Sequence, residues 1–458
     1  MRVSSKPKIM DSKTTKILAV AVVAIVIVAG LAVFFVMNNK DDKGKSSMGS
    51  GRLLVYGNAD NDDYYDEADV DLIKKIADSG TWDSTKYPFA DANYDGKVTQ
   101  DDVTYMENFL KGGKGKMYYI DHYGHTSYFN YPLGDRTVAV VGSSSGGYHG
   151  LIAGQMLGFY DHITAADSSL RTMDESIYPG VSQLKDIGNY NSGDIDTTVE
   201  NIVSAGCSVA LGGVYQGVYD AMHNLPGEYD YILLYTSAFI ATGGGPDVVA
   251  KTMTMGVLLD CADEAREYVK YYDDIQEQVK KAASQLKNMS YVICYNTKNA
   301  VTTHIDTVAS DGSCAGDTWM IYNHLPMTDI ADHSGKNYYE VDIETVLQWD
   351  PDVIFVVVSG NTAETAEEAK AVFEERAAYF SESRAYKNGM VFGSYYAVIG
   401  TVIGVSQLNL LASYLWPGTF DEEDGWDILQ DCVDDTLINH IDVRKSGYTY
   451  LFRMNTNA

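Results

Sequence analysis

Positive charge and cysteine are both scarce in this sequence. Its 458 residues include 34 Lys and Arg against 63 Asp and Glu, which gives a formal net charge of −29. This charge argues against nucleic acid as a partner, because its phosphates would repel the chain. The five cysteines form no C-x-x-C pair and no metal-ligand spacing. We expect them to be small buried side chains, with a single disulfide such as Cys294–Cys314 as the alternative.

Few familiar catalytic motifs are present. Gly142-Ser-Ser-Ser-Gly146 has the G-x-S-x-G spacing of a turn that can expose a nucleophilic serine, and we interpret it as a serine-rich turn before a helix. No Walker loop, H-E-x-x-H or dinucleotide-binding fingerprint occurs in the context that it requires. We therefore expect a protein that is not an enzyme and that holds no catalytic cofactor.

One long apolar run is present near the N-terminus. The 21 residues from Ile17 to Met37 carry no charge, and as a helix they would be about 31 Å long, enough to cross a bilayer core. Five basic residues and one acid precede the run, which predicts a cytoplasmic N-terminus and an extracellular remainder. We predict a cytoplasmic stub (1–16), a single-pass transmembrane anchor (17–37) and a flexible tether (38–52). A cleaved signal peptide is the alternative to the anchor.

Two loop–helix repeats with calcium-binding spacing follow the tether, over residues 53–113. The second repeat has oxygen-bearing side chains at loop positions 1, 3, 5 and 12, a backbone carbonyl at position 7 and Gly96 at the sharp turn: Asp91, Asn93, Asp95, Asp102 and, at position 7, Lys97. The first repeat keeps the spacing without the glycine: Asn58, Asp60, Asp62, Asp69 and, at position 7, Tyr64. Because Ca²⁺ prefers six to eight oxygen ligands, the sequence predicts two Ca²⁺ ions.

These repeats carry a family resemblance. With Asp at position 12 of both loops and about thirty residues between them, residues 53–111 resemble a dockerin domain. The resemblance implies a small all-α calcium module that binds a cohesin-like protein. Loop positions 10 and 11, which read the partner in that family, are here Glu67-Ala68 and Gln100-Asp101 rather than a hydroxyl-bearing pair. A calcium-stiffened spacer is therefore the alternative.

The rest of the chain contains one helix–turn–strand pattern twice, at 199–213 and 343–357. Each copy begins as a short amphipathic helix, breaks at Ala205-Gly206 or Asp350-Pro351, and enters a continuous apolar strand. A strand that is apolar on both faces is typical of a parallel sheet covered by helices. We therefore predict an α/β fold with two lobes and a ligand cleft between them.

A series of motifs in a fixed order makes residues 117–452 resemble the substrate-binding proteins of ABC importers for iron–siderophore, haem and cobalamin. The series includes Asp121-His-Tyr-Gly124, a strand after Pro132, a serine-rich turn at 143–147 and a helical stretch at 245–286. The resemblance implies a first lobe, a long connecting helix and a second lobe: 117–245, 246–287 and 288–452. It also implies a small-molecule metal chelate as the ligand and an ABC permease in the membrane as the partner.

Ligands of open α/β sheets lie beyond the carboxyl ends of the strands. Candidate side chains there could stack on a flat ligand, donate hydrogen bonds or reach a metal inside it: Ser144, Tyr148, His149, Tyr190, Tyr215, His304, Trp319 and Tyr396. The sequence thus predicts a membrane-anchored extracellular protein that captures an iron–siderophore, haem or corrinoid-type ligand. An oxyanion or a free metal ion is the alternative ligand. A dockerin-bearing cell-surface scaffold or adhesion protein is the alternative function.

Overall fold

The computed structural model describes most of the chain beyond residue 50: residues 51–142, 147–191, 193–237, 245–295, 297, 299–310, 313, 325–331, 335–358, 366–395, 402–444 and 451–454. The chain divides into two units, Met1–Met48 and Gly49–Ala458, and the account below concerns the second. The predicted anchor at 17–37 lies outside the described residues. Within the described ranges, no helix is both long and apolar enough to cross a membrane.

Each calcium-type loop is followed by a helix, as the sequence predicts. These helices are α2 (Glu67–Ser79) and α3 (Gln100–Leu110). In both, the residue at loop position 12 also closes a capping box, in which its carboxylate accepts a hydrogen bond from the backbone of the N-cap residue. Ile73 of α2 and Met106 of α3 are buried in one small apolar core. The two repeats therefore pack as a pair.

The residues just before this helix pair belong to the core of the neighbouring lobe. Strands β1 (Gly115–Ile120) and β2 (Thr126–Tyr131) form an antiparallel hairpin. Val55 makes an antiparallel bridge to Tyr119, and both side chains are fully buried. The calcium-type module is thus joined to the lobe by packing as well as by the chain.

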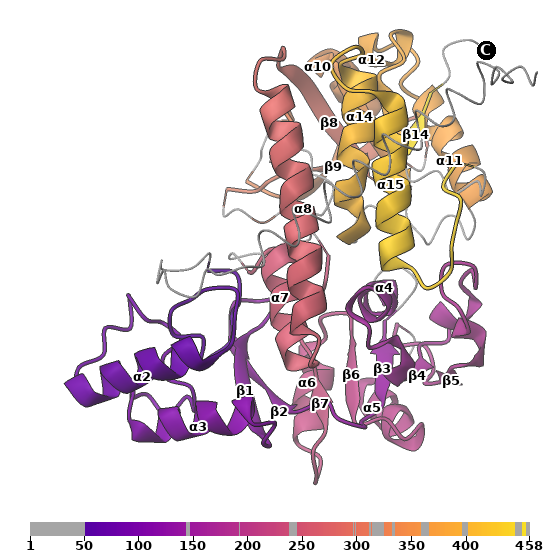
Figure 1. Ribbon diagram of the computed structural model, residues 1–458. Coiled ribbons are helices and arrows are strands. Elements are labelled where there is room, and N and C mark those ends of the chain that lie inside the picture. Colours follow the sequence, from indigo (N-terminus) through magenta and orange to yellow (C-terminus); the bar gives the residue numbers. More distant parts are fainter. Residues whose placement is uncertain are drawn as a thin grey trace, which may run out of the picture. The chain divides into compact units, whose positions relative to one another are not determined.

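The first lobe is built on a five-stranded sheet whose order is β5-β4-β3-β6-β7 and whose strands are all parallel. Its strands are β3 (Val138–Val141), β4 (Ile163–Ala166), β5 (Lys185–Asp186), β6 (Val209–Gly212) and β7 (Asp230–Tyr231). Its α-helices are α4 (Tyr148–Leu157), α5 (Ile195–Ser204) and α6 (Gln216–His223) (Figure 1). Short 3₁₀ turns lie at Tyr160–His162, Leu170–Thr172 and Val181–Gln183.

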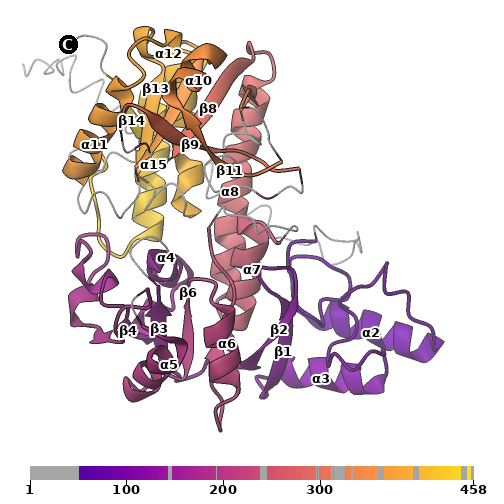
Figure 2. The same cartoon turned by 180° about the vertical axis from the view of Figure 1, so that it is seen from behind.

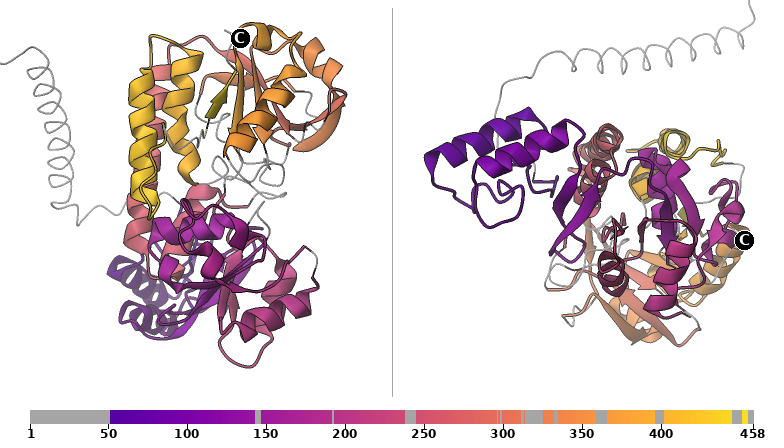
Figure 3. Two further views of the ribbon diagram at one scale, coloured as in Figure 1. Left: turned by 90° about the vertical axis from the view of Figure 1, so that its right-hand side faces the viewer. Right: turned by 90° about the horizontal axis from the view of Figure 1, so that it is seen from below.

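Two helices connect the lobes where the sequence predicted one over 246–287. They are α7 (Val248–Leu258) and α8 (Ala262–Ala283), and Asp260 between them has a left-handed backbone with φ 61°. That conformation ends α7, so the expectation of one continuous helix is corrected. All eleven residues of α7 are buried. Helix α8 runs on toward the second lobe, where α14 (Leu408–Leu415) lies against it (Figures 1 and 3).

The second lobe is built on a seven-stranded mixed sheet, seen from behind in Figure 2. Strands β10, β8, β12 and β13 pair in parallel, whereas β9, β11 and β14 join as antiparallel neighbours. The strands are β8 (Met289–Tyr295), β9 (Thr302–Asp306), β10 (Met327–Asp329), β11 (Tyr338–Asp342), β12 (Val353–Val358), β13 (Val391–Tyr395) and β14 (Leu451–Arg453). The helices are α10 (Ile343–Trp349), α11 (Ala366–Ala378), α12 (Arg384–Lys387), the 3₁₀ turn Val402–Gln407, α14 (Leu408–Leu415) and α15 (Glu422–Thr436).

The predicted helix–turn–strand repeat is confirmed in both sheets. Helix α5 leads into the interior strand β6, and α10 leads into the interior strand β12. All residues of both strands are buried, as expected for strands that are covered on both faces. Both breaks use a left-handed residue, Gly206 at φ 84° and Asp350 at φ 45°.

The described cysteines are buried and free, as expected for small core side chains: Cys207, Cys261, Cys294 and Cys432. The disulfide considered for Cys294 is therefore not present. Burial raises the pKa of the Cys432 thiol to about 11, which keeps it protonated at neutral pH.

Candidate functional site

Two tyrosines stack at the carboxyl edge of the first sheet. Tyr190 follows β5 and Tyr215 follows β6, and their ring centroids lie 3.7 Å apart with 25° between the ring planes. Both side chains are half-buried. Beside them, the Tyr123 hydroxyl donates to the Val214 carbonyl at 2.8 Å. The structure thus brings two of the predicted residues together as an aromatic wall whose faces and edges are suited to a flat ligand.

A buried polar cluster lies at the start of α4. The His149 ring is 1% exposed and packs edge-on to Tyr235 with 4.4 Å between ring centroids. Neither ring nitrogen of His149 has a hydrogen-bond partner among the described residues. Burial lowers the pKa of His149 to about 3, and the charge of Lys251 lowers it further in the same direction. The imidazole is therefore neutral at physiological pH, the state in which its nitrogen can bind a metal.

Lys251 supplies the positive charge of this cluster. Its side chain is fully buried in α7, and its Nζ donates to the Ser237 carbonyl at 2.7 Å. Burial also lowers the pKa of His122 to about 3, again with Lys251 acting in the same direction. A buried cation on α7 therefore lies next to two neutral imidazoles of the first lobe.

Sequence reasoning missed Lys251, His122 and Tyr235. A usable signal was present for the lysine, because it is the one charged residue within the apolar stretch VVAKTMTMGVL of α7. A charge inside an otherwise apolar helix is rarely buried without a structural or functional partner. No comparable pattern marks His122, which joins the cluster only through the fold.

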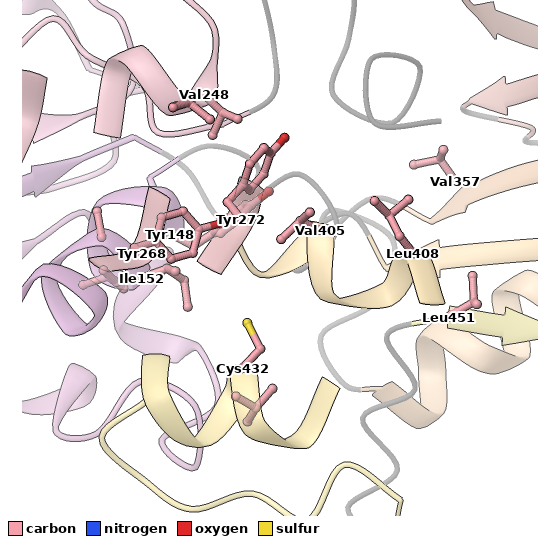
Figure 4. Packing of buried hydrophobic residues seen from close by; sticks show 14 of the residues in the cluster. Tyr148, Ile152, Val248, Tyr268, Tyr272, Val357, Val405, Leu408, Cys432 and Leu451 are labelled. Atoms are coloured by element: carbon pink, nitrogen blue, oxygen red, sulfur yellow. The ribbon is translucent and has the colours of Figure 1, made fainter. Parts of the chain in front are cut away.

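Tyr148, another predicted ligand residue, lies in the hydrophobic core. Its side chain is fully buried and its ring stacks on His149 at 4.3 Å. Figure 4 shows it in the same cluster as Ile152, Tyr268 and Tyr272 of α4 and α8. The structure therefore gives Tyr148 a packing role behind His149 rather than an exposed position on a binding wall.

In the second lobe, the predicted residue His304 lies on the antiparallel edge of the sheet. Its ring on β9 stacks on Tyr338 of β11 at 4.6 Å, and its Nε2 is 3.9 Å from a Glu340 oxygen. Among the described residues, no contact joins His304 to the Tyr190–Tyr215 pair. The remaining candidates, Ser144, Trp319 and Tyr396, lie outside the described residues.

The second calcium-type loop, 91–102, is folded by its own carboxylates. Asp91 accepts from the backbone amides of Asp95 at 3.0 Å and Gly96 at 2.8 Å. Asp102 accepts from Asn93 at 3.1 Å and is fully buried. Gly96 has φ 88°, the left-handed turn for which position 6 needs glycine.

The first loop, 58–69, repeats this arrangement of carboxylates and backbone amides. Asp69 accepts from Ala59 at 2.7 Å, as Asp102 does from its own loop. Position 4 is left-handed in both loops, at Asn61 and Tyr94. In addition, the Asn58 Oδ1 atom at position 1 is buried with no hydrogen-bond partner. An orphaned buried acceptor at a ligand position fits a bound cation.

Neither loop holds three or more His, Cys, Asp or Glu side chains grouped tightly enough to form a metal site by themselves, as far as the described residues go. Each loop would have to complete its ligand set with Asn, backbone carbonyls and water, as calcium loops of this length do.

Three solved structures share the fold. The chain is similar to the TroA-like periplasmic binding protein FepB from Veillonella parvula, at 16% identity over 74% of this chain and 99% of that one, with a TM-score of 0.53. MolA of Haemophilus influenzae bound to molybdate gives 14% identity over 70% and 97% of the two chains, with a TM-score of 0.53. CeuE of Helicobacter pylori as a nickel–histidine complex gives 13% over 72% and 98%, with a TM-score of 0.51.

Residues 246–394, from just before α7 into β13, match the model of a family described as periplasmic binding protein. A search of curated proteins finds no match. The chain thus has the α/β fold of TroA-like periplasmic binding proteins. The matched family is one of binding proteins rather than of enzymes, in line with the expectation that the protein is not an enzyme.

Proposed function

We propose that this protein is the substrate-binding component of an ABC importer. The observation that carries the proposal is the pair of sheets connected through α7 and α8, in a chain whose residues 246–394 match the periplasmic binding protein family. A helical connection permits small hinge motions of the lobes, because helices resist bending more than extended strands do. Such a protein holds its ligand for a permease without chemical change.

The ligand that we propose is a metal chelate of the iron–siderophore, haem or corrinoid type. The Tyr190–Tyr215 stack offers aromatic surface to a flat or catecholate ligand. The neutral ring of His149 offers a metal ligand, provided that a small movement opens its buried nitrogens. An oxyanion is the alternative ligand; the buried charge of Lys251 favours an anion nearby, and MolA, which shares the fold, was solved with molybdate.

A titration of the full chain, purified in mild detergent, would test this proposal. Tyrosine and tryptophan fluorescence is recorded against ferric siderophores, haem, corrinoids, molybdate and bare divalent metals. We expect quenching with a Kd at or below about 1 μM for one chelate class. If no compound in the panel binds, or if only a bare metal ion binds, the proposed ligand class is wrong.

We also propose that residues 17–37 anchor the protein with its folded part outside the cell. The support is the length of the uncharged run and the basic residues before it. Before protease treatment, the protein should be found in the membrane fraction. Protease added to intact cells should then degrade residues 53–458. Release of an intact soluble protein into the medium would instead favour a cleaved signal peptide.

The calcium-type loops are proposed to bind two Ca²⁺ ions that stiffen residues 53–113. The residues that would hold them are those predicted from the spacing, and the orphaned Asn58 oxygen supports the first site. Ca²⁺ supplies the positive charge that clustered carboxylates lack. Docking to a cohesin-like partner is the alternative role. The burial of Val55 in the core of the lobe favours a spacer that is fixed to the binding protein.

Calorimetry on the full chain would separate the two loops. We expect two Ca²⁺ per chain, and Asp102→Asn should remove one of them. Asp101→Asn is the matched control, because this neighbouring carboxylate is exposed and lies at position 11. At a hundredfold excess over Kd, each bound Ca²⁺ should stabilise the fold by about 2.7 kcal/mol. An unchanged melting temperature with EDTA would overturn the proposal, and stoichiometric capture of a cohesin by the protein would favour docking.

A further inference from the structure

A cavity lies away from the residues of the candidate ligand site, where the calcium-type module, the β1–β2 hairpin and the α7–α8 junction meet. Its volume is about 460 Å³, within the range of sites that hold small molecules. Its floor is apolar and buried: Phe109, Met117 and Val257. Neither the family resemblance nor the calcium spacing assigns a role to this cavity.

Aromatic and acidic side chains form the walls above this floor. Tyr64, Tyr65 and Tyr131 supply rings, and Tyr64 is 52% exposed. Four carboxylates also line the cavity, against a single cation, Arg266: Asp66, Asp260, Asp263 and Glu264. The lining therefore carries an excess of negative charge beside electron-rich ring faces.

Arg266 already shows how a cation is held here. Its guanidinium lies 4.5 Å from the centroid of the Tyr64 ring and pairs with Asp263. Its Nη1 also donates to the Asp63 carbonyl at 3.4 Å. These contacts fix Arg266 on one side of the cavity and leave the charge of the other wall unbalanced.

Asp260 and Glu264 make up that unbalanced wall. In the described part of the chain, no Lys, Arg or His lies within ion-pair distance of either carboxylate. Burial, and then the neighbouring Asp260 carboxylate, raise the pKa of the Tyr131 hydroxyl. Asp260 also has a left-handed backbone and lies in the break between helices α7 and α8.

We propose that this cavity binds a small organic cation, an alkylammonium with a short apolar chain. The ammonium group would lie between Asp260, Glu264 and the Tyr131 ring, where carboxylates and ring faces both attract positive charge. The apolar chain would cover the floor formed by Phe109, Met117 and Val257. An anion is disfavoured by the carboxylates, and a neutral molecule would leave them unbalanced.

The test compares three probes of one shape: n-butylammonium, n-butanol and butyrate. Isothermal titration calorimetry on the full chain in mild detergent should detect the ammonium, with a Kd between about 10 μM and 1 mM. The neutral and anionic probes should bind at least about tenfold more weakly. Equal binding of butanol, or no ammonium binding at concentrations up to about 10 mM, would overturn the proposal.

Variants locate the binding within the cavity. Asp260→Asn with Glu264→Gln should weaken ammonium binding about tenfold, and asparagine tolerates the left-handed backbone at position 260. Glu267→Gln is the matched control, because this exposed carboxylate lies on the same helix outside the cavity. An equal loss of ammonium affinity in the double variant and in Glu267→Gln would assign the effect to the net negative charge of the protein, and the proposed site would be rejected. If the double variant fails to fold, Tyr64→Leu is the substitute, because Tyr64 is 52% exposed and its loss should leave the fold intact. Loss of the aromatic ring should weaken ammonium binding about threefold.

Discussion

The two lobes share one helix–strand unit, but an ion pair of the first lobe is buried whereas an ion pair of the second lobe is exposed. In the first lobe, Asp230 is fully buried and its carboxylate lies 2.8 Å from Arg136, whose side chain is 15% exposed. In the second lobe, Arg384 pairs with Asp350 at 3.2 Å, and both side chains are about half exposed, at 48% and 54%. A buried charge that loses its partner is costly, whereas an exposed pair is screened by water. Loss of the Arg136–Asp230 pair should therefore cost more stability than loss of the Arg384–Asp350 pair.

The largest expected effect is the loss of the buried ion pair. Arg136→Gln leaves the Asp230 carboxylate without its guanidinium, although Asn130 still donates to it at 2.9 Å and His223 remains 3.2 Å away. We expect the free energy of unfolding to fall by about 3 kcal/mol, measured by urea denaturation at pH 7.5. A loss below about 1 kcal/mol would mean that the two lobes do not differ as proposed.

The next effect is a dependence of stability on pH that comes from the first lobe. The pKa of His149 is about 3 in the folded state, below its ordinary value of 6.5, because burial and then Lys251 disfavour its protonation. Protons thus bind the unfolded chain preferentially, and stability falls as the pH drops from about 6.5 toward 3. At pH 5 we expect His149 to cost about 2 kcal/mol relative to pH 7.5.

His149→Phe checks that prediction, because phenylalanine keeps an aromatic ring against Tyr235 and cannot be protonated. The variant should lose less stability than the parent protein between pH 7.5 and pH 5, in chemical denaturation at both values. His304→Phe is the matched variant in the second lobe, where the ring is 30% exposed. Identical pH slopes for His149→Phe and the parent protein would contradict the prediction.

Ligand affinity should also distinguish the lobes. Removal of the Tyr215 ring by Tyr215→Leu takes away one half of the aromatic stack, and we expect the Kd of the bound chelate to rise about tenfold. His304→Gln acts on a ring that already stacks on Tyr338, and we expect a change below about threefold. Both are measured by the fluorescence titration described above. A larger effect of His304→Gln would move the main ligand contacts to the second lobe.

The smallest effect is expected for the exposed ion pair. Arg384→Gln removes contacts to Asp350 and to Asp352, the latter at 3.0 Å, yet all of these side chains reach solvent. The free energy of unfolding should change by less than about 1 kcal/mol under the conditions used for Arg136→Gln. A loss as large as that of Arg136→Gln would remove the difference between the lobes.

The sequence predicted the sheets better than the site. Val209–Gly212 and Val353–Val358 are short apolar runs that follow a helix and a break, and such local patterns are enough to indicate a buried parallel strand. The break between α7 and α8 was missed because Asp260 looks like an ordinary helical residue in the sequence. Its left-handed backbone, at φ 61°, is a conformation that aspartate adopts only occasionally, so the sequence alone does not indicate it.

The side-chain positions of the candidate site were harder to predict than the strands. Tyr190 and Tyr215 were predicted because each lies shortly after a strand and the carboxyl ends of parallel strands share one edge of the sheet, and the structure stacks their two rings. The same reasoning selected Tyr148, which packs in the core instead. The position of a residue in the sequence indicates where its backbone lies in the fold. Whether its side chain faces solvent or the interior depends on the residues that pack around it.

The sequence by itself determined the spacing of the two calcium-type loops, the helices that follow them and the apolar strands of both lobes. Each of these depends on residues within about a dozen positions, where backbone geometry relates spacing directly to structure. Only the tertiary structure decided that Lys251 lies beside His122 and His149, and that Tyr64 and Arg266 share one cavity. Residues so far apart in the chain meet only when helices and sheets pack, because the free energy that brings them together comes from the burial of the surrounding core.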